Sequence, residues 1–292
     1  KMVAALRRLG FNNVFDVDFT ADLTIMEEGY EFLGRVTNGG VLPMMTSCSP
    51  GWIKFVEHYY PELIPNLSSC KSPQQMFGAV CKTYYAEKLG IPAEKISVVS
   101  IMPCTAKKFE KGRPFQSAAG VPDIDHVLTT RELARLIKRK GILFNNLPDE
   151  EYDVPFGIGS GAGLIFGVTG GVMEAALRTA YFTLKGENPP ADAFKAVRSG
   201  GFQENSGVQE AEFAIGDIRL RIAAVSGLGN TRRLLQQIER GEVHYDFVEV
   251  MACPGGCVGG GGQPIHDGEE LAFARGRKLY DLDAKAKLRY SH

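Results

Sequence analysis

Short apolar runs alternate with longer amphipathic segments along most of this 292-residue chain. Apolar runs of about four to eight residues are typical of buried strands, and apolar residues spaced by three and four are typical of helices. When the two alternate, each helix can return the chain to the start of the next strand, so the pattern favours an α/β fold with parallel strands. We expect strands at 14–19, 41–46, 96–102, 126–129, 220–225 and 247–251, and helices at 21–37, 51–60, 73–89, 131–140, 170–183 and 231–240.

The chain is long enough for two compact units, since domains commonly contain about 100–200 residues. The segment 144–163 is the expected junction between them. We therefore expect an N-terminal lobe at 1–150 and a C-terminal lobe at 151–292, each with a mostly parallel sheet flanked by helices. The glycine-rich run at 157–163 is not interpreted as a dinucleotide loop, because no convincing strand precedes it and no acidic residue follows about 20 positions later at a strand end.

Composition excludes several kinds of partner. The net charge of −1 and the pI near 6.6 lack the basic excess of a nucleic-acid-binding protein. No run of about 18 apolar residues could span a bilayer and no signal peptide is visible, so a cytoplasmic location is expected. The residues 1–10 have the pattern of a helix without a start, which suggests a piece of a longer chain.

The six cysteines are the residues whose placement points to chemistry. Apolar residues form 44% of the chain, so its core needs no disulfides to hold it together. Cys48, Cys104 and Cys253 each follow a predicted strand. In open α/β sheets, ligands bind beyond the carboxyl ends of the strands, so three strands are expected to bring sulfur to one site. Cys81 lies in a predicted helix and is expected to be a core thiol.

The segment 251–264, Met-Ala-Cys-Pro-Gly-Gly-Cys-Val-Gly-Gly-Gly-Gly-Gln-Pro, has the strongest pattern. Two thiolates four residues apart, Cys253 and Cys257, can bind one iron–sulfur cluster. The six glycines of this segment let the backbone approach inorganic atoms closely, and its N–H groups can donate to cluster sulfides. A zinc site would need a second pair of this kind, and the sequence has none.

Two further segments supply candidate ligands. In 101–110, Ile-Met-Pro-Cys-Thr-Ala-Lys-Lys-Phe-Glu, Lys107 follows Cys104 by three residues and can donate to an anionic ligand or cluster. In 46–52, Thr-Ser-Cys-Ser-Pro-Gly-Trp, the helix start leaves Cys48 near free N–H donors, which favour the thiolate. Either segment by itself is also compatible with a core thiol.

Together, and in the right order, the three segments resemble the signatures T-S-C-C-P-x-W, M-P-C-x-x-K-x-x-E and M-A-C-x-x-G-C-x-x-G-G-G-Q-P of FeFe hydrogenases. The similarity extends along the chain and includes 71–75 and 156–174. The resemblance implies a two-lobed domain with its active centre between the lobes, and the reversible reduction of protons to dihydrogen. It also implies a 4Fe-4S cluster joined to a diiron centre with cyanide, carbon monoxide and dithiolate ligands.

The resemblance further implies roles for individual residues. The cubane cluster would be held by Cys104, Cys253 and Cys257, and Cys257 would also bridge to the diiron centre. Lys107 would bind a cyanide ligand. The wall of the pocket would be formed by Met102, Met251, Phe166 and Gln74.

The first signature departs from the family pattern at one position. The family usually has two adjacent cysteines there, the first passing protons and the second ligating the cluster, and here the second is Ser49. A serine oxygen is a weaker ligand for iron than a thiolate. Three alternatives are open: Ser49 ligates the cluster, Cys48 shifts to ligate it, or Cys70 reaches in from the next segment. Cys48 is the preferred ligand.

The helix predicted ahead of the first cysteine carries Glu28, Glu31 and Arg35 on one face, because residues three and seven apart share a face. Such a pattern is often only a solvated charged stripe, but this helix leads into the strand that ends at Cys48. In the family that this chain resembles, the matching positions form a proton relay, which would run from Arg35 through Glu31, Ser68 and Glu28 to the Cys48 thiol. The complete set favours an active enzyme.

The expected electron partner is a carrier such as ferredoxin, or further iron–sulfur or flavin subunits linked to a nicotinamide. No nucleic-acid partner and no membrane span are expected. Two alternative functions stay open. A non-catalytic iron–sulfur assembly protein would have no use for Lys107 or for a proton relay, whereas a hydrogen-sensing regulator with a slow site is compatible with Ser49.

Overall fold

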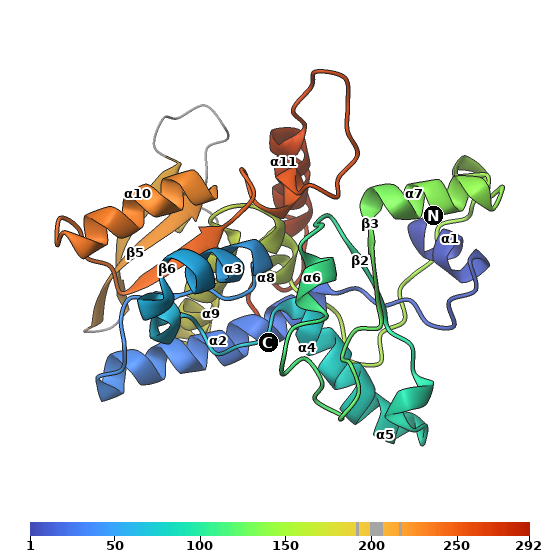
Figure 1. The fold of residues 1–292 in the computed structure, drawn as a ribbon, viewed down its shortest axis with the longest axis horizontal. Coiled ribbons are helices and arrows are strands. Elements are labelled where there is room, and N and C mark those ends of the chain that lie inside the picture. The colour runs from blue at the N-terminus through green and yellow to red at the C-terminus, as the bar shows by residue number, and fades with distance from the viewer. Residues whose placement is uncertain (191–192, 199–206, 216–217) are drawn as a thin grey trace.

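The computed structural model describes the whole chain except residues 191–192, 199–206 and 216–217. Within that part of the chain, a four-stranded sheet in the order β1-β6-β5-β4 lies at one end of the molecule and a two-stranded sheet, β2-β3, lies at the other (Figure 1). Three of the four strand pairs are parallel, and helices flank both sheets. The expected α/β class with mostly parallel sheets is confirmed.

The strands are β1 (Met44–Met45), β2 (Val99–Met102), β3 (His126–Thr129), β4 (Val208–Ile215), β5 (Ile218–Ser226) and β6 (Phe247–Met251). The α-helices are α1 (Met2–Arg8), α2 (Asp18–Asn38), α3 (Pro50–Tyr59), α4 (Pro73–Val80), α5 (Ala86–Leu89), α6 (Lys107–Glu110), α7 (Thr130–Arg139), α8 (Gly161–Leu164), α9 (Gly171–Lys185), α10 (Leu228–Glu239) and α11 (Ala272–Asp283). Short helical turns are η1 (Pro61–Asn66), η2 (Cys81–Tyr85), η3 (Ala93–Lys95), η4 (Phe144–Asn146), η5 (Ile165–Gly167), η6 (Lys195–Val197) and η7 (Cys257–Gly259).

The larger sheet is covered on both faces. On one face, Trp52 of α3 and Leu234 of α10 share an apolar cluster with Val248 of β6. On the other face, Met173 of α9 shares a cluster with Phe247. β6 is buried along its whole length, because β1 and β5 pair with its two edges. The end of β6, and the cysteines that follow it, therefore lie in the middle of the molecule.

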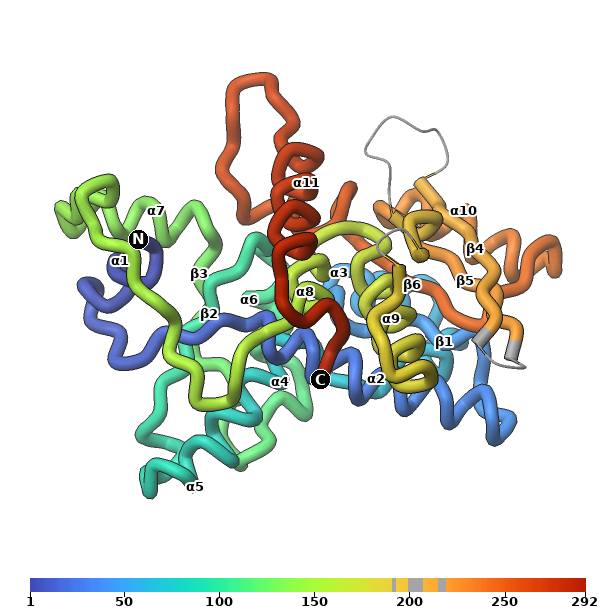
Figure 2. The backbone as a smooth tube through the Cα atoms, turned by 180° about the vertical axis from the view of Figure 1, so that it is seen from behind, coloured from blue at the N-terminus to red at the C-terminus, as the bar shows by residue number. Residues whose placement is uncertain are grey.

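The smaller sheet is also covered by helices. On one side, Ala5 of α1 and Leu133 of α7 share an apolar cluster that also contacts β2. On the other side, Cys81 of η2 packs in a cluster with Val127 of β3, as expected for a core thiol. Figure 2 shows α11 between the two sheets, with the C-terminus beside α2. The residues that follow β1, β2 and β6 thus come together in the middle of the molecule.

Several predicted elements coincide with observed ones. β3 and β6 have the predicted bounds. Thr129 and Glu132 form a capping box at the start of α7, in which each side chain accepts a hydrogen bond from the backbone N–H of the other. The predicted helices are present with shifted ends, and the one predicted at 73–89 consists of α4, the π-helical turn η2 and α5.

Other predictions are wrong. No strand forms at 14–19, because the backbone of Val14 bonds Asp153 instead: its N–H donates to the carboxylate at 2.7 Å and its C=O accepts from the backbone N–H at 2.8 Å. β1 keeps only two of the residues predicted at 41–46. The sequence pattern also did not predict β4, an edge strand on which charged and apolar residues mix, or α11.

The chain's division into lobes at residue 150 stays a prediction. β1, from the first half of the chain, joins β6 from the second half in one sheet. Across the residues that the structure describes, no helix is both long enough and apolar enough to cross a membrane.

Candidate metal-cluster site

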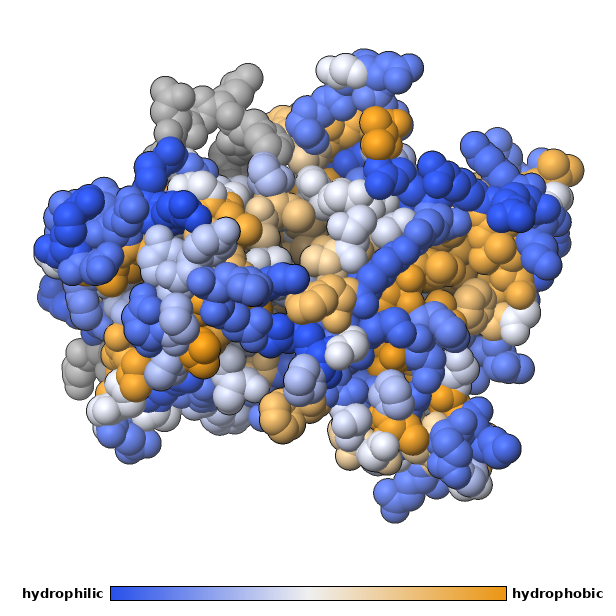
Figure 3. Space-filling model, in the orientation of Figure 1, coloured by the Kyte–Doolittle hydropathy of each residue, from blue (hydrophilic) through white to orange (hydrophobic). Residues whose placement is uncertain are grey.

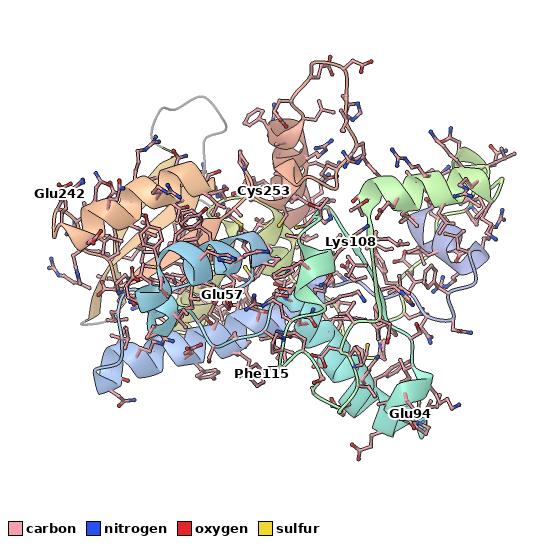
Figure 4. The ribbon with its side chains drawn as sticks, viewed as in Figure 1. Glu57, Glu94, Lys108, Phe115, Glu242 and Cys253 are labelled. Atoms are coloured by element: carbon pink, nitrogen blue, oxygen red, sulfur yellow. The ribbon has the colours of Figure 1, made fainter. Side chains whose placement is uncertain are left out.

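A cavity of about 510 Å³ lies where β1, β2 and β6 end. Its lining includes four cysteines: Cys48 after β1, Cys104 after β2, and Cys253 and Cys257 after β6. Figure 4 shows Cys253 near the centre of the molecule, close to the base of α11. Figure 3 shows less polar residues gathered in the middle of the same face, with hydrophilic ones around them. The fold thus gathers thiols that are more than 200 residues apart in sequence.

Glycines allow the loop after β6 to pack directly against the loop after β2. A Cβ atom on Gly262 would lie only 2.8 Å from the backbone nitrogen of Cys104. The Gly262 N–H donates to the Pro103 C=O at 2.9 Å, which fixes the two loops together. Gly256 adopts a φ of 93°, a left-handed conformation that side-chain-bearing residues rarely adopt. The glycine-rich segment is therefore the backbone wall that holds the cysteine loops together.

The thiols lie close enough to influence one another's ionisation. Burial, followed by the neighbouring Cys104 thiol, raises the pKa of Cys253. Burial and Cys104 also raise the pKa of Cys257, to about 11. Buried thiolates that repel one another need a cation between them, and iron would supply that charge. The donor set therefore fits a metal group.

The cysteines are spread around the cavity. In the described part of the chain, no group of three or more His, Cys, Asp or Glu side chains could hold one metal ion. A cubane cluster does not need such a group, because each thiolate binds a different iron at a different corner. Cysteines spread around a cavity of about 510 Å³ meet this requirement.

Lys107, from the start of α6, is a buried cation on the cavity wall. Its Nζ donates to the Cys48 C=O at 2.9 Å and to both carboxylate oxygens of Glu110 at 3.0 Å. Glu110 also accepts hydrogen bonds from Ser72 and Gln74, each at 3.0 Å. A buried ammonium held in this way can present a fixed positive charge to an anionic ligand.

The remaining predicted wall residues also line this cavity. Gln74 is fully buried and accepts from Ser100 Oγ at 2.8 Å. Met251 packs in an apolar cluster that Phe166 contacts. The residues predicted for the wall that are found there are Gln74, Met102, Phe166 and Met251.

The three candidates for the last cluster ligand have different positions. Cys48 and Ser49 both line the cavity, and Ser49 is the residue just before α3. Burial and the nearby Glu28 raise the pKa of Cys48, while Lys107 opposes them. Cys70 lines a separate cavity, where its Sγ lies 3.7 Å from Glu31 Oε2.

The predicted relay residues form a connected set. Arg35 Nη2 donates to Glu31 Oε1 at 2.6 Å, and Ser68 Oγ donates to Glu31 Oε2 at 3.0 Å. Ser68 is also near enough to Glu28 to lower its pKa, and Glu28 in turn influences Cys48. The set runs from the partly exposed Arg35 to the wall of the cysteine cavity.

The environment moves the pKa values of the two glutamates of this set in opposite directions. Burial raises the pKa of Glu28 to about 7, and its Oε1 atom has no hydrogen-bond partner among the described residues. Burial also acts to raise the pKa of Glu31, but hydrogen bonds from Arg35, Ser69 and Ser68 outweigh it and lower the pKa overall. An inner carboxyl with a raised pKa beside an outer carboxylate with a lowered pKa is an arrangement through which protons can step.

Two buried carboxylates at the site were given no role from sequence. Glu110 pairs with Lys107, and Glu249, in the middle of β6, accepts from the backbone N–H groups of Gly170 and Met173 at 2.7 Å each. Glu249 thereby fixes the start of α9 to the sheet. A glutamate inside an apolar strand was the only sequence feature that could have indicated it, because its partners lie about 80 residues away.

An α/β fold with a thiol-lined cavity at its strand ends defines a candidate iron–sulfur protein. Residues 1–261 match the family model described as iron only hydrogenase large subunit, C-terminal domain. The chain belongs to this family.

Relatives and solved structures agree with this assignment. The chain is 55% identical to the NADP-reducing hydrogenase subunit HndD of Solidesulfovibrio fructosivorans, over 100% of this chain and 50% of that protein. It is 33% identical to the cytosolic Fe-S cluster assembly factor narfl of Xenopus tropicalis, over 92% of this chain and 58% of that protein. A solved variant of the FeFe hydrogenase HydA1 from Chlamydomonas reinhardtii matches with a TM-score of 0.83 and 44% identity, over 100% of this chain and 80% of that chain. The chain thus spans little more than half the length of these two curated relatives.

Proposed function

We propose that this chain is the catalytic domain of an FeFe hydrogenase, which reversibly reduces protons to dihydrogen. The observation that carries the proposal is the meeting of four cysteines and Lys107 in one cavity, with the hydrogen-bonded residues Arg35, Glu31 and Ser68 nearby. A merely structural cluster would need the cysteines but neither the lysine nor the carriers.

The cysteines would hold a 4Fe-4S cluster joined to a diiron centre. Cys104, Cys253 and Cys257 would ligate the cubane, and Cys257 would bridge to the diiron unit. When bound, this organometallic group would supply the site at which protons and electrons combine. The glycine-rich loop would hold it closely enough to exclude water.

The other cavity residues would orient and enclose the diiron unit with its cyanide, carbon monoxide and dithiolate ligands. Lys107 would donate to a cyanide, and its pairing with Glu110 would keep its ammonium in one place. Met102, Met251 and Phe166 would keep the wall apolar, and Gln74 would offer a polar group fixed by Ser100.

The fourth cubane ligand would be Cys48. The thiolate is the softer donor, and Ser49 would then stand beside it as a hydroxyl. Ser49 as the ligand, with Cys48 as the last proton carrier, is the alternative arrangement, since both residues line the cavity. Cys70 is disfavoured because its thiol lies at Glu31 in the other cavity.

Protons would travel from Arg35 at the outside through Glu31, Ser68 and Glu28 toward Cys48. Arg35 would mark the outer end, the Glu31 and Glu28 carboxyls and the Ser68 hydroxyl would carry the proton, and Glu28 can take one up readily because its pKa lies at about 7. Electrons would come from ferredoxin, or from iron–sulfur or flavin subunits linked to a nicotinamide. The name of the HndD relative, an NADP-reducing hydrogenase subunit, supports the second source. A cytoplasmic location stays a prediction.

The test is to mature the full-length protein with the diiron centre. We expect infrared bands of cyanide and carbon monoxide, together with dihydrogen evolution from a reduced dye. A cluster without these bands would favour an iron–sulfur assembly role, in line with the relative from Xenopus tropicalis. Bands without turnover would favour a hydrogen sensor.

A further inference from the structure

A second cavity, of about 450 Å³, lies beside the relay, and its lining includes the exposed residues Glu57 and Ile64. Pro50 lines both this cavity and the cysteine cavity. Figure 4 shows Glu57 on α3. The relay residues Arg35 and Ser68 are part of the lining, and so is Cys70. A thiol that the relay did not include therefore lies on its solvent side.

The position of Cys70 is fixed by its neighbours. Its backbone N–H donates to Ser68 Oγ at 3.2 Å, and its C=O accepts from Ser47 Oγ at 2.7 Å. Its Sγ lies 3.7 Å from Glu31 Oε2, a normal distance for a hydrogen bond that involves the larger sulfur atom. Cys70 is thus in contact with both Glu31 and Ser68, the two groups between which a proton would have to pass.

The thiol can act here only as a neutral donor. Glu31 is an acceptor surrounded by donors, since Arg35 bonds Oε1 at 2.6 Å and the Ser69 N–H lies 2.9 and 3.1 Å from its two oxygens. Burial, together with the Glu28 and Glu31 carboxylates, raises the pKa of Cys70 to about 12. Cys70 therefore keeps its S–H and points it at a carboxylate oxygen.

We propose that Cys70 is a positioning residue of the proton relay, whose S–H holds Glu31 Oε2 against Ser68 Oγ. This inference rests on the proposed function, because it concerns the path of the proton. In the step, Glu31 first takes up a proton at Oε2 from water on the solvent side. That proton then passes to Ser68 Oγ while the hydroxyl proton of Ser68 passes to the Glu28 carboxylate. Glu31 becomes an anion, Glu28 becomes neutral, and Ser68 is unchanged.

The step requires the Ser68 hydroxyl to turn from Glu31 to Glu28. While it turns, Glu31 Oε2 loses the Ser68 donor and keeps the S–H of Cys70 and the N–H of Ser69. Without the thiol, only the backbone donor would hold this oxygen in place. A small shift of Oε2 would lengthen the path to Ser68, and proton transfer needs hydrogen-bond distance.

The experiment compares Cys70→Ala, Cys70→Ser and Cys81→Ala in the full-length, matured enzyme. Cys81 is the matched control, because it is a core thiol in the cluster with Val127, away from both cavities. We expect Cys70→Ala to lower turnover about two- to fivefold, the range that a weak S–H···O bond supports, and to raise the solvent isotope effect. Cys70→Ser restores a hydrogen-bond donor, so its turnover and its solvent isotope effect should be close to those of the wild type. If Cys70→Ala has the turnover and isotope effect of Cys81→Ala, the proposal is overturned.

An infrared measurement tests the contact without turnover. The S–H stretching band of Cys70 should lie at the lower frequency of a hydrogen-bonded thiol, vanish in Cys70→Ala and shift in Glu31→Gln. A band that does not respond to Glu31→Gln would overturn the proposed contact even in an active enzyme. If the wild type shows this band but no hydrogen turnover, the proposed function itself has failed and the relay role fails with it.

Discussion

Replacing Glu31 with Gln is the sharpest test of the proton relay, because the change keeps the shape of the side chain and removes only its charge and proton-accepting capacity. In the structure the Glu31 carboxylate accepts from Arg35, from Ser68 and from the Ser69 backbone, and Cys70 Sγ lies 3.7 Å away. An amide keeps one acceptor oxygen and turns an NH₂ group toward donors that need an acceptor. It also cannot carry a proton at neutral pH.

The structure sets the expected size of two effects of Glu31→Gln, the loss of turnover and the loss of stability. A positioned acid or base contributes about 10²–10⁴-fold to a proton-transfer step, so turnover should fall at least about 100-fold if protons pass through Glu31. The Arg35–Glu31 pair is partly buried, with side chains 16% and 17% exposed. Hydrogen bonds to a charged group are worth about 1.5–3 kcal/mol and the Gln oxygen retains part of this, so we expect a loss of about 1–2 kcal/mol in the free energy of unfolding.

The assay measures dihydrogen evolution from a reduced dye, iron content and thermal unfolding on the same preparations. Iron content should be unchanged, because Glu31 bonds Arg35, Ser68 and Ser69 and is not part of the lining of the cysteine cavity. The matched control is Glu27→Gln, an exposed residue on the same helix, which should have wild-type turnover. Wild-type turnover in Glu31→Gln would refute the relay; a loss of turnover with a loss of iron would show a structural effect instead.

Three further predictions follow from the site. Burial raises the pKa of Glu28 from 4.5 to about 7, so between these pH values the folded chain binds more protons than the unfolded chain. The free energy of unfolding of the cluster-free protein should therefore fall by up to about 3 kcal/mol as the pH rises through this interval. Urea unfolding at several pH values should show a smaller fall for Glu28→Gln. If Cys48 is the fourth cubane ligand, Cys48→Ala should lose iron and the electron paramagnetic resonance signal of the cluster, and Ser49→Ala should keep both. The opposite result would identify Ser49 as the ligand. Glu110→Gln leaves the buried Lys107 ammonium without its anion, which should lower the free energy of unfolding by about 3–5 kcal/mol in a denaturant titration. If loss of the ion pair is the cause, the double variant with Lys107→Met should regain part of this free energy.

Part of this protein follows from local sequence. β3 and β6 could be predicted to the residue because each is a short apolar run ended by turn or cap residues, and the Thr129–Glu132 capping box needs only residues three apart. The cysteines could be assigned to strand ends for the same reason. β1 and β6 are parallel neighbours in one sheet, so their carboxyl ends share one edge and bring Cys48 and Cys253 to it. Cys104 follows β2 in the other sheet, so its place beside them depends on how the two sheets pack.

The other features of the fold and of the site depend on contacts between distant segments, which no local sequence pattern contains. Val14 was predicted as part of a strand, but it bonds Asp153, and β1 joins β6 across about 200 residues. Cys70 lies against Glu31, and its backbone C=O accepts from Ser47, which belongs to another segment. The sequence by itself therefore determined the fold class and, through the order of the three signatures, the family. Which cysteines line the cavity at the strand ends, and that Cys70 lies against Glu31 instead, was decided only by tertiary structure, because the direction of a side chain depends on partners that folding brings from far along the chain.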